Sequence, residues 1–238
     1  MRKALVLLPV LMLGGCHMAF GKDSGPRETR SFPVGAFDKI DLAGSPEVTV
    51  QVGGAPSVRA EGSKEAVDRL EIKVENGALH IGRRSSDGGW HFGWHHDGRV
   101  HIVVTTPTLA GANIAGSGDI RVDKVAGARF DGSVAGSGDL AITHMEVGEA
   151  HFSIAGSGDV SAAGKAGKAS FQTAGSGDVR AGALETQTVS ISIMGSGDAQ
   201  AHATQSAEIS IMGSGDVHVA GTTNCAIHKA GSGDARCG

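Results

Sequence analysis

The chain has 238 residues, of which 38 are glycine and none is tyrosine, and only 4% are aromatic and 19% charged. A formal net charge of −4 argues against a nucleic-acid-binding protein, which needs a basic surface to offset phosphate charge. Because aromatic side chains are scarce, alanine, valine and isoleucine must fill most of the interior, so we expect a narrow, layered core.

Residues 1–21 are expected to be an export signal. Two basic residues precede an apolar run over 4–15, which is shorter than the ~20 residues of a membrane-spanning helix and fits the apolar region of a secretory signal. The sequence Leu-Gly-Gly-Cys at 13–16 is typical of a lipoprotein signal, in which Cys16 would be lipidated and become the mature N-terminus. Alternatively, the small residues at 19 and 21 favour ordinary cleavage before Lys22, and a buried N-terminal helix is a third interpretation. Either export route predicts a protein of the cell envelope, in the periplasm or at the outer membrane.

Residues 22–31 are expected to be a linker before a single domain over 32–238. The first part of that domain, residues 32–110, contains strand-like segments and a loop. The second part, residues 111–238, contains the repeats described below.

The segment 31–84 alternates between apolar and polar residues as β-strands do. It has a Gly-Gly turn at 53–54 and one short helical turn over 63–70. Residues 44–47, Gly-Ser-Pro-Glu, resemble an eroded copy of the Gly-Ser-Gly-Asp motif found later in the chain. They predict that the repetitive fold begins near residue 40.

Both tryptophans and several histidines occur in the segment 90–101. Its flanking Ser, Asp and Gly residues predict a surface loop between two strands. Two other interpretations stay open: a site for zinc, copper or nickel, since histidine-rich tracts bind such metals, or a binding tip that uses its aromatic side chains. The candidate ligand-binding residues are Trp90, Trp94, His95 and His96.

From residue 115 onward the motif Gly-Ser-Gly-Asp occurs seven times at spacings of 18 to 20 residues. A period of about 20 residues is typical of repeat proteins, in which each unit stacks on the previous one. The aspartates of the motif are Asp119, Asp139, Asp159, Asp178, Asp198, Asp216 and Asp234.

Apolar residues alternate with polar ones on both sides of each motif, which indicates strands with one buried face. We therefore predict an all-β fold, a parallel β-solenoid with coils of 18–20 residues, capped by the strand-rich N-terminal half. Each motif would turn a corner, where glycine can adopt positive φ and the Ser and Asp side chains can bond nearby backbone N–H groups.

A metal-binding alternative remains for the seven aspartates. Stacked ~4.8 Å apart, neighbouring carboxylates would repel one another by roughly 0.9 kcal/mol even at water's dielectric constant, and a bound Ca²⁺ would relieve that repulsion. However, one carboxylate per coil provides few of the 6–8 oxygen ligands that calcium takes. Calcium is therefore the alternative interpretation, and a structural corner with no cofactor is the preferred one.

Two cysteines lie near the C-terminus of the chain. Cys225 and Cys237 both fall on the inward parity of the last repeat, and exported proteins keep disulfides. The two residues could form a disulfide that closes the last coil, or remain two buried free thiols.

The order of these segments resembles the head GIN domain of auto-transporter adhesins over about residues 32–236. The resemblance is carried by Phe-Asp-x-Ile at 37–40, the short helix, the entry Ile-x-Val-Thr-x-Pro-x-Leu at 102–109 and the Gly-Ser-Gly-Asp array. It implies an exported bacterial envelope protein with a β-solenoid fold, and it provides no catalytic residues.

The preferred functional hypothesis is a non-enzymatic scaffold or adhesin-like binding module of the cell envelope. Its partners would be surface glycans or proteins, with no nucleic acid and with membrane contact only through a lipid anchor. The outward ladder of Ser, Asn and Gln six residues before each Asp suits repetitive polar partners such as glycans. A calcium-binding module and a polysaccharide-active β-helix enzyme are the alternatives.

Overall fold

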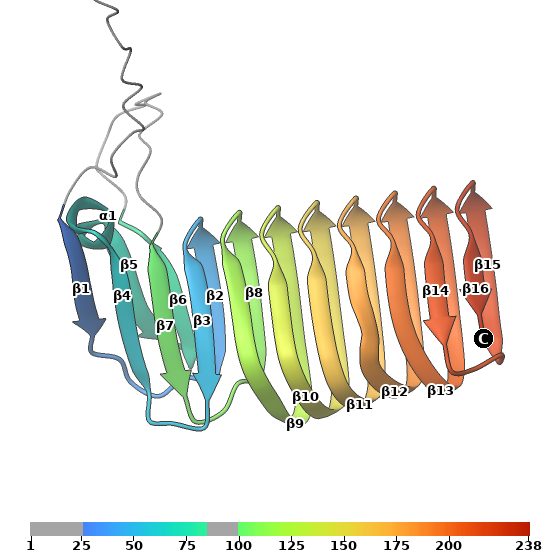
Figure 1. The fold of residues 1–238 in the computed structure, drawn as a ribbon, viewed down its shortest axis with the longest axis horizontal. Coiled ribbons are helices and arrows are strands. Elements are labelled where there is room, and N and C mark those ends of the chain that lie inside the picture. Colours follow the sequence, from blue (N-terminus) through green and yellow to red (C-terminus); the bar gives the residue numbers. More distant parts are fainter. Residues whose placement is uncertain (1–25, 85–99) are drawn as a thin grey trace, which may run out of the picture.

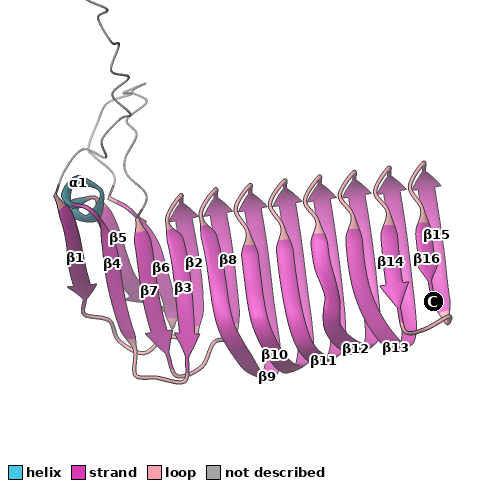
Figure 2. Ribbon diagram, in the orientation of Figure 1, coloured by secondary structure: helices cyan, strands magenta, loops and turns pink. Residues whose placement is uncertain are grey.

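The computed structural model describes residues 26–84 and 100–238, which form a parallel β-solenoid (Figure 1). The predicted fold class is confirmed. Figure 2 shows how completely strands dominate it, with α1 (Lys64–Asp68) as the helix of the described residues. No helix in the described ranges is long and apolar enough to cross a membrane. The strands are β1 (Arg27–Phe32), β2 (Lys39–Gly44), β3 (Glu47–Val52), β4 (Ser57–Ser63), β5 (Leu70–Glu75), β6 (Ala78–Arg83), β7 (His101–Thr106), β8 (Gly111–Gly116), β9 (Asp119–Gly136), β10 (Leu140–Gly156), β11 (Val160–Gly175), β12 (Val179–Gly195), β13 (Ala199–Gly213), β14 (Val217–Ala220), β15 (Cys225–Gly231) and β16 (Ala235–Cys237).

Each central coil is one long strand that leaves a corner, bends, and returns to the next corner. The corners line up along the top of Figure 1 and the bends along the bottom. Neighbouring coils pair in parallel and in register, so that Gly156 at the end of β10 lies opposite Gly136 of β9 and Gly175 of β11. We call the outer side of the segments before the corners the pre-corner face (β2, β8, β15 and the later halves of β9–β13). The outer side of the segments after the corners is the post-corner face (β3, β14, β16 and the earlier halves of β9–β13).

The two glycines of each corner are required because neighbouring coils touch there. A Cβ on Gly136 would lie closer than 3.0 Å to the carbonyl oxygen of Gly116, and a Cβ on Gly138 would lie as close to that of Gly118. Gly136 also has φ +128°, which side chains disfavour. The N–H of Ser137 donates to the carbonyl oxygen of Gly116 at 2.9 Å. The motif therefore repeats because the same close backbone contact occurs at every level.

The corner aspartates bond backbone N–H groups, as predicted, but they do so between coils. The N–H of Asp139 donates to Oδ1 of Asp119 at 3.0 Å, and the same bond continues to Asp234 at 2.8–3.0 Å. The serines behave differently from the prediction. At the described corners their side chains are exposed, and their hydroxyls bond no protein group. Serine contributes its backbone to the corner, and aspartate contributes its side chain.

The Gly-Ser-Pro-Glu segment at 44–47 is a true first corner, so the prediction that the solenoid begins near residue 40 is confirmed. Gly44 lies opposite Gly116, and Glu47 lies opposite Asp119. The N–H of Asp119 donates to the carbonyl oxygen of residue 46 at 3.1 Å. At several later corners the residue in this place donates its N–H to the preceding coil, as Gly138 does to Gly116, whereas proline has no N–H to donate.

The core is a narrow stack of aliphatic columns with one short aromatic stack. The ring of Phe152 lies 5.9 Å from that of Phe130 and 5.4 Å from that of Phe171, the latter pair nearly parallel. Gly132 makes room for this stack, since a Cβ there would lie 2.6 Å from the Phe152 ring. Further along the same column the residues become Ile191 and Ile209, and buried Ala, Val and Ile fill the rest, as the composition predicts.

An irregular cap covers the N-terminal end of the solenoid. β1 pairs antiparallel with β4 over its whole length, and β4 pairs antiparallel with β7. The expected linker over 22–31 is therefore wrong for residues 27–31, because their alternating residues supply an edge strand to the sheet. The predicted helical turn over 63–70 is α1, with the Ser63 hydroxyl accepting from the N–H of Ala66. β5 and β6 form a hairpin whose turn residues Asn76 and Gly77 both have positive φ, as tight hairpin turns require.

The C-terminal coil is closed by covalent and charged groups. A disulfide joins Cys225 of β15 to Cys237 of β16 across the end of the stack. Lys229 occupies the inward column that Ile211 fills in the coil before it, and its Nζ lies 3.3 Å from the Asp234 carboxylate. A charged side chain at this point opposes further strand addition, as edge lysines do in other sheets.

Candidate functional site

Both outer faces of the solenoid carry exposed ion pairs. On the post-corner face, Arg180 lies 2.8 Å from the Asp159 carboxylate and 3.2 Å from that of Asp178. Arg121 likewise pairs with Glu47. Exposed ion pairs contribute only ~0–1 kcal/mol, so these contacts offset the charge of individual ladder carboxylates and add little stability.

The pre-corner face carries its outward side chains in straight rows, and in the repeats the two rows nearest the corners hold mostly small or uncharged residues. Strand register places one outward residue from each strand directly opposite the next, from β5 at the cap to β15 at the end. We call this set the polar row: Lys73, His80, Asp41, Asn113, Ser133, Ser153, Gln172, Ser192, Ser210 and His228. Beside it runs the small row: Ala43, Ala115, Ala135, Ala155, Ala174, Met194, Met212 and Ala230.

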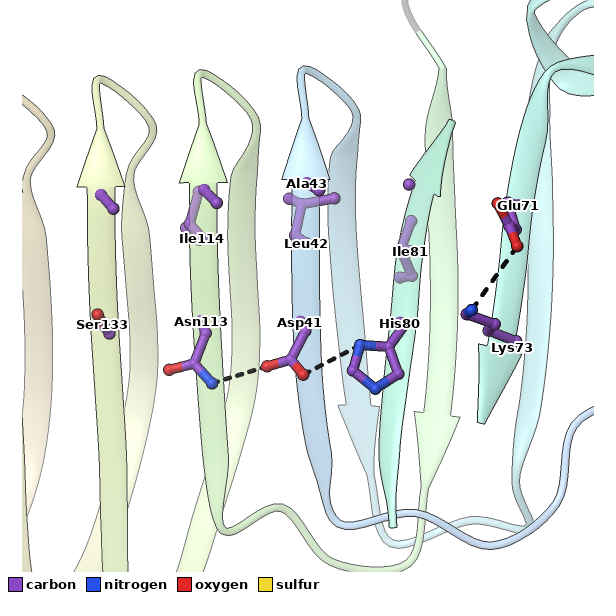
Figure 3. Close-up of a pocket in the computed structure, with 13 residues that line it drawn as sticks. Asp41, Leu42, Ala43, Glu71, Lys73, His80, Ile81, Asn113, Ile114 and Ser133 are labelled. Atoms are coloured by element: carbon purple, nitrogen blue, oxygen red, sulfur yellow. Dashed lines mark hydrogen bonds and ion pairs between the residues drawn. The ribbon is translucent and has the colours of Figure 1, made fainter. Parts of the chain in front are cut away.

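A groove of about 410 Å³ opens where the pre-corner face meets the cap, and we call it the N-terminal groove. It crosses β5, β6, β2, β8 and β9, as Figure 3 shows. The floor of the hollow is formed by Ala43, Gly82, Ala115 and Ala135, which have little or no side chain. The longer side chains of Lys73 and His80, from the β5–β6 hairpin, line the groove beside this floor.

The groove contains a chain of polar contacts along the polar row, one of them a hydrogen bond and the other a histidine–carboxylate contact. Nδ1 of His80 lies 3.2 Å from Oδ2 of Asp41, and Nδ2 of Asn113 donates to Oδ1 of the same carboxylate at 2.7 Å (Figure 3). Asp41 thus holds both neighbours in place. The amide oxygen of Asn113 can accept a hydrogen bond from a ligand, as can Nε2 of a neutral His80 protonated at Nδ1, and the second N–H of the Asn113 amide can donate one.

Lys73 forms the charged wall of the groove. Its Nζ lies 3.0 Å from Glu75 and 3.8 Å from Glu71. The hydrogen bond with Glu75, followed by the negative charges of Glu75 and Glu71, raises the pKa of Lys73 above its usual value. The side chain is therefore a permanent cation at neutral pH, with two carboxylates beside it.

A second groove of about 410 Å³ lies on the same face near the bends of β10 to β15, and we call it the C-terminal groove. Its centre is lined by the hydroxyls of Ser170, Thr188, Ser190 and Ser206. None of these hydroxyls bonds another protein group in the described structure. The same groove is also lined by the charged residues Glu149, Lys168 and Glu208. Both hollows of the pre-corner face thus combine neutral hydroxyl or amide groups with charged side chains.

The structure gives the seven corner aspartates the ladder bonds described above. Within the described ranges, no group of three or more His, Cys, Asp or Glu side chains is arranged to hold a metal ion. Calcium binding by this ladder stays a prediction, which thermal unfolding with a chelator and then with millimolar Ca²⁺ would test.

Of the other predicted sites, the structure describes the C-terminal cysteine pair and does not describe the rest. Cys225 and Cys237 are joined, whereas the free-thiol alternative would keep them in separate columns. The predicted signal with Cys16, and the candidate ligand-binding residues Trp90, Trp94, His95 and His96, lie outside the described residues.

Sequence reasoning did not find the N-terminal groove. It identified Asn113 and the serines of the polar row, because they share one position of the repeat. Asp41 and His80 were missed because they precede the repeats, and only the pairing of β2 with both β6 and β8 brings them beside Asn113. The one signal in the sequence was that Asp41 and His80 each occupy an outward-facing position of a segment that alternates like a strand.

Comparison with known proteins gives consistent results. Residues 36–224 match the family described as "putative auto-transporter adhesin, head GIN domain". The structure is similar to that of a "putative adhesin" from Bacteroides fragilis, with a TM-score of 0.81 and 25% identity over 90% of this chain and 98% of that one. No curated protein matches the chain.

Two further solved structures share the fold. A "putative lipid binding protein" from Parabacteroides distasonis has a TM-score of 0.71 and 24% identity, over 90% of this chain and 98% of that one. A "putative adhesin" from Parabacteroides merdae has a TM-score of 0.69 and 17% identity, over 90% and 97% of the two chains. At these identities the likeness concerns the fold alone.

Proposed function

The chain belongs to the head GIN domain family of auto-transporter adhesins, and from this premise we propose that it is an exported, non-enzymatic binding module of the cell envelope. Its pre-corner face binds glycans, and the N-terminal groove holds the sugar units that are recognised most closely. The polar chain in this groove, in which Asp41 accepts a hydrogen bond from Asn113 and contacts the imidazole of His80, is the observation that carries the proposal.

The chemistry of the groove supports a sugar ligand. Sugar hydroxyls donate and accept hydrogen bonds in adjacent pairs, and they need a few fixed polar groups on a mostly apolar surface. Asn113 and His80 are such groups, held by a shared carboxylate, and the small row supplies a flat apolar floor beside them. Lys73 adds a cation that favours sugars carrying a carboxylate or another acidic group.

A binding role fits the side-chain arrangement better than catalysis does. His80 is oriented by Asp41, but in the described part of the chain no hydroxyl or thiol is hydrogen-bonded to it as a nucleophile would be. The carboxylates of the corners are alike at every level, whereas a hydrolase or lyase needs one distinct cluster. A polysaccharide-active enzyme remains the alternative, and release of reducing ends or unsaturated products from uronate polymers would reveal it.

Export and anchoring rest on residues 1–21 and on the family. We propose that the chain leaves the cytoplasm and is held in the envelope through lipidated Cys16. Membrane fractionation of cells producing the parent chain or Cys16→Ser tests this, since only the parent should incorporate labelled lipid. Secretion of both forms without lipid would favour ordinary cleavage before Lys22.

Glycan binding is tested on an array of envelope and host polysaccharides, with affinities then measured by calorimetry. Asn113→Ala removes one or two ligand hydrogen bonds of about 1 kcal/mol each, which corresponds to roughly fivefold weaker binding per bond. His80→Ala should weaken binding similarly. Gln200→Ala is the matched control, because Gln200 is an exposed amide on the post-corner face.

The outcomes separate the alternatives. Loss of affinity in Asn113→Ala and His80→Ala, with the control unchanged, supports the groove as the glycan site. Equal affinity in all three variants places glycan binding elsewhere, and no binding to any polysaccharide contradicts the proposal.

A further inference from the structure

Two methionines interrupt the small row of the pre-corner face. Met194 and Met212 occupy the position that alanine fills in the other described repeats, and they lie directly opposite each other on β12 and β13. Their exposed fractions are 51% and 54%. Two flexible thioethers therefore stand side by side in water, about 4.8 Å apart at the backbone.

Core packing does not account for this pair. The interior of the same coils is filled by Ile191, Ile193, Ile209 and Ile211, all buried, and the alternation of the strands points the methionines away from it. The remaining large exposed apolar residue in the described ranges, Ile227, lies on the inward column of the last coil. The methionine pair is thus a feature of the outer face alone.

An imidazole stands on the next strand. His228 of β15 lies two residues before Ala230, which is opposite Met212, so His228 is the diagonal neighbour of Met212 on the same face. Diagonal neighbours are about 7–8 Å apart, within reach of long side chains. The outward residues that flank the pair in the two rows are neutral, namely Ala174, Ala230, Ser192 and Ser210.

We propose that Met194, Met212 and His228 form a site for a soft monovalent cation, Cu(I) or Ag(I). Thioethers are soft, polarizable donors that select Cu(I) over the harder divalent ions, and imidazole binds copper as well. The three ligands are neutral, so the site favours a singly charged ion. Hard ions such as Ca²⁺ and Mg²⁺, which take oxygen ligands, are excluded. This site is independent of glycan binding in the N-terminal groove.

The test uses the full chain labelled with ¹³C at the methionine methyl groups and titrated with Ag(I) in chloride-free buffer. Ag(I) needs no reductant, so the Cys225–Cys237 disulfide stays intact. A Cys16→Ser background removes the remaining thiol. The variants Met194→Leu and Met212→Leu assign the two signals by their disappearance, and Met145, which is fully buried, is the internal control.

We expect the Met194 and Met212 signals to shift together and to saturate at one Ag(I) per pair, while the Met145 signal stays fixed. The double variant Met194→Leu/Met212→Leu keeps the shape of the surface, and its melting temperature should equal that of the parent. His228→Gln should weaken the shift of both signals at least tenfold in Ag(I) concentration.

Three results would overturn the proposal. The first is two unmoved methyl signals at equimolar Ag(I), and the second is a shift of one methionine without the other. The third is an unchanged titration in His228→Gln, which would remove the imidazole from the site.

Discussion

The cap and the repeat array of this solenoid are built on opposite rules. In the array, residues 111–238, each coil repeats the corner, the ladder bond and the buried columns of the coil before it. In the described part of the cap, within residues 26–110, strands pair out of sequence order, a hairpin and a helix intervene, and three strand pairings are antiparallel. The N-terminal groove lies where the two regions meet.

The difference shows how stability and recognition are divided. Identical coils add nearest-neighbour contacts of the same kind, which is an efficient way to hold a long narrow core. They also present the same side chains at every level, so a distinct chemical site needs an interruption. The β5–β6 hairpin beside β2 is one such interruption, and the methionine pair is another.

The largest predicted effect is in the aromatic stack of the array. Phe152→Ala removes a fully buried ring between Phe130 and Phe171, and should lower the free energy of unfolding by about 3–5 kcal/mol. Phe32→Ala, at a half-buried position on the edge strand of the cap, should cost less than half as much. Urea denaturation measures both, and equal losses would mean that the cap is as tightly packed as the array.

The next effect concerns corner contacts. Gly177→Ala places a Cβ against the carbonyl oxygen of Gly158, so we expect a loss of about 3 kcal/mol or more in unfolding free energy. Gly182→Ala in the same coil is the matched control, because the nearest atom to its added Cβ is 4.0 Å away. The control should stay within about 0.5 kcal/mol of the parent. A tolerant Gly177→Ala would show that the coils can separate at the corner.

Removal of the disulfide should affect one end only. The double variant Cys225→Ser/Cys237→Ser frees a bridge between residues 12 apart in sequence, and the chain-entropy model assigns about 3 kcal/mol to a loop of roughly this size. Hydrogen exchange should show faster opening of β15 and β16 with unchanged protection of β10. Uniform loss of protection along the array would instead mean that the solenoid unfolds as one unit.

The aspartate ladder is expected to contribute a smaller amount at each level. Asp159→Ala leaves the N–H of Asp178 without its acceptor and Arg180 without one partner, at a cost of about 1–2 kcal/mol. Asp159→Asn keeps an oxygen acceptor and should stay close to the parent. If both variants lose the same stability in thermal unfolding, the carboxylate charge matters and the hydrogen bond alone does not explain the ladder.

The smallest effect is a pH dependence in the cap. Hydrogen bonds from Lys64 and then Arg30 lower the pKa of Asp68. A depressed carboxyl pKa stabilises the fold above the unfolded value of about 3.9, and that contribution is lost as pH falls through the lower folded pKa. The urea midpoints of the parent and Asp68→Asn should therefore differ at about pH 6, and the difference should shrink as the pH falls below the unfolded value of about 3.9. If the difference in urea midpoint stays the same at acid pH, the packing of the Asp68 side chain, and not its charge, accounts for the effect of the substitution.

Much of this architecture could be predicted from local pattern. The alternation around each aspartate identified the strands, the period gave the coil length, and the Gly-Ser-Pro-Glu segment marked the first corner. The N-terminal edge strand over Arg27–Phe32 was missed because an edge strand buries little, and its residues resemble those of a polar linker. Asp41 and His80 were missed because they carry no repeated signal.

The sequence by itself determined the solenoid, because spacing, glycine and alternation are local properties that every coil repeats. It also determined the inward parity of Cys225 and Cys237 and the outward parity of the methionines. Only the tertiary structure decided which strands of the cap lie side by side, and therefore that His80, Asp41 and Asn113 form one groove. The physical reason is that pairing outside the repeat depends on the shape of the whole sheet edge, which no short stretch of residues encodes.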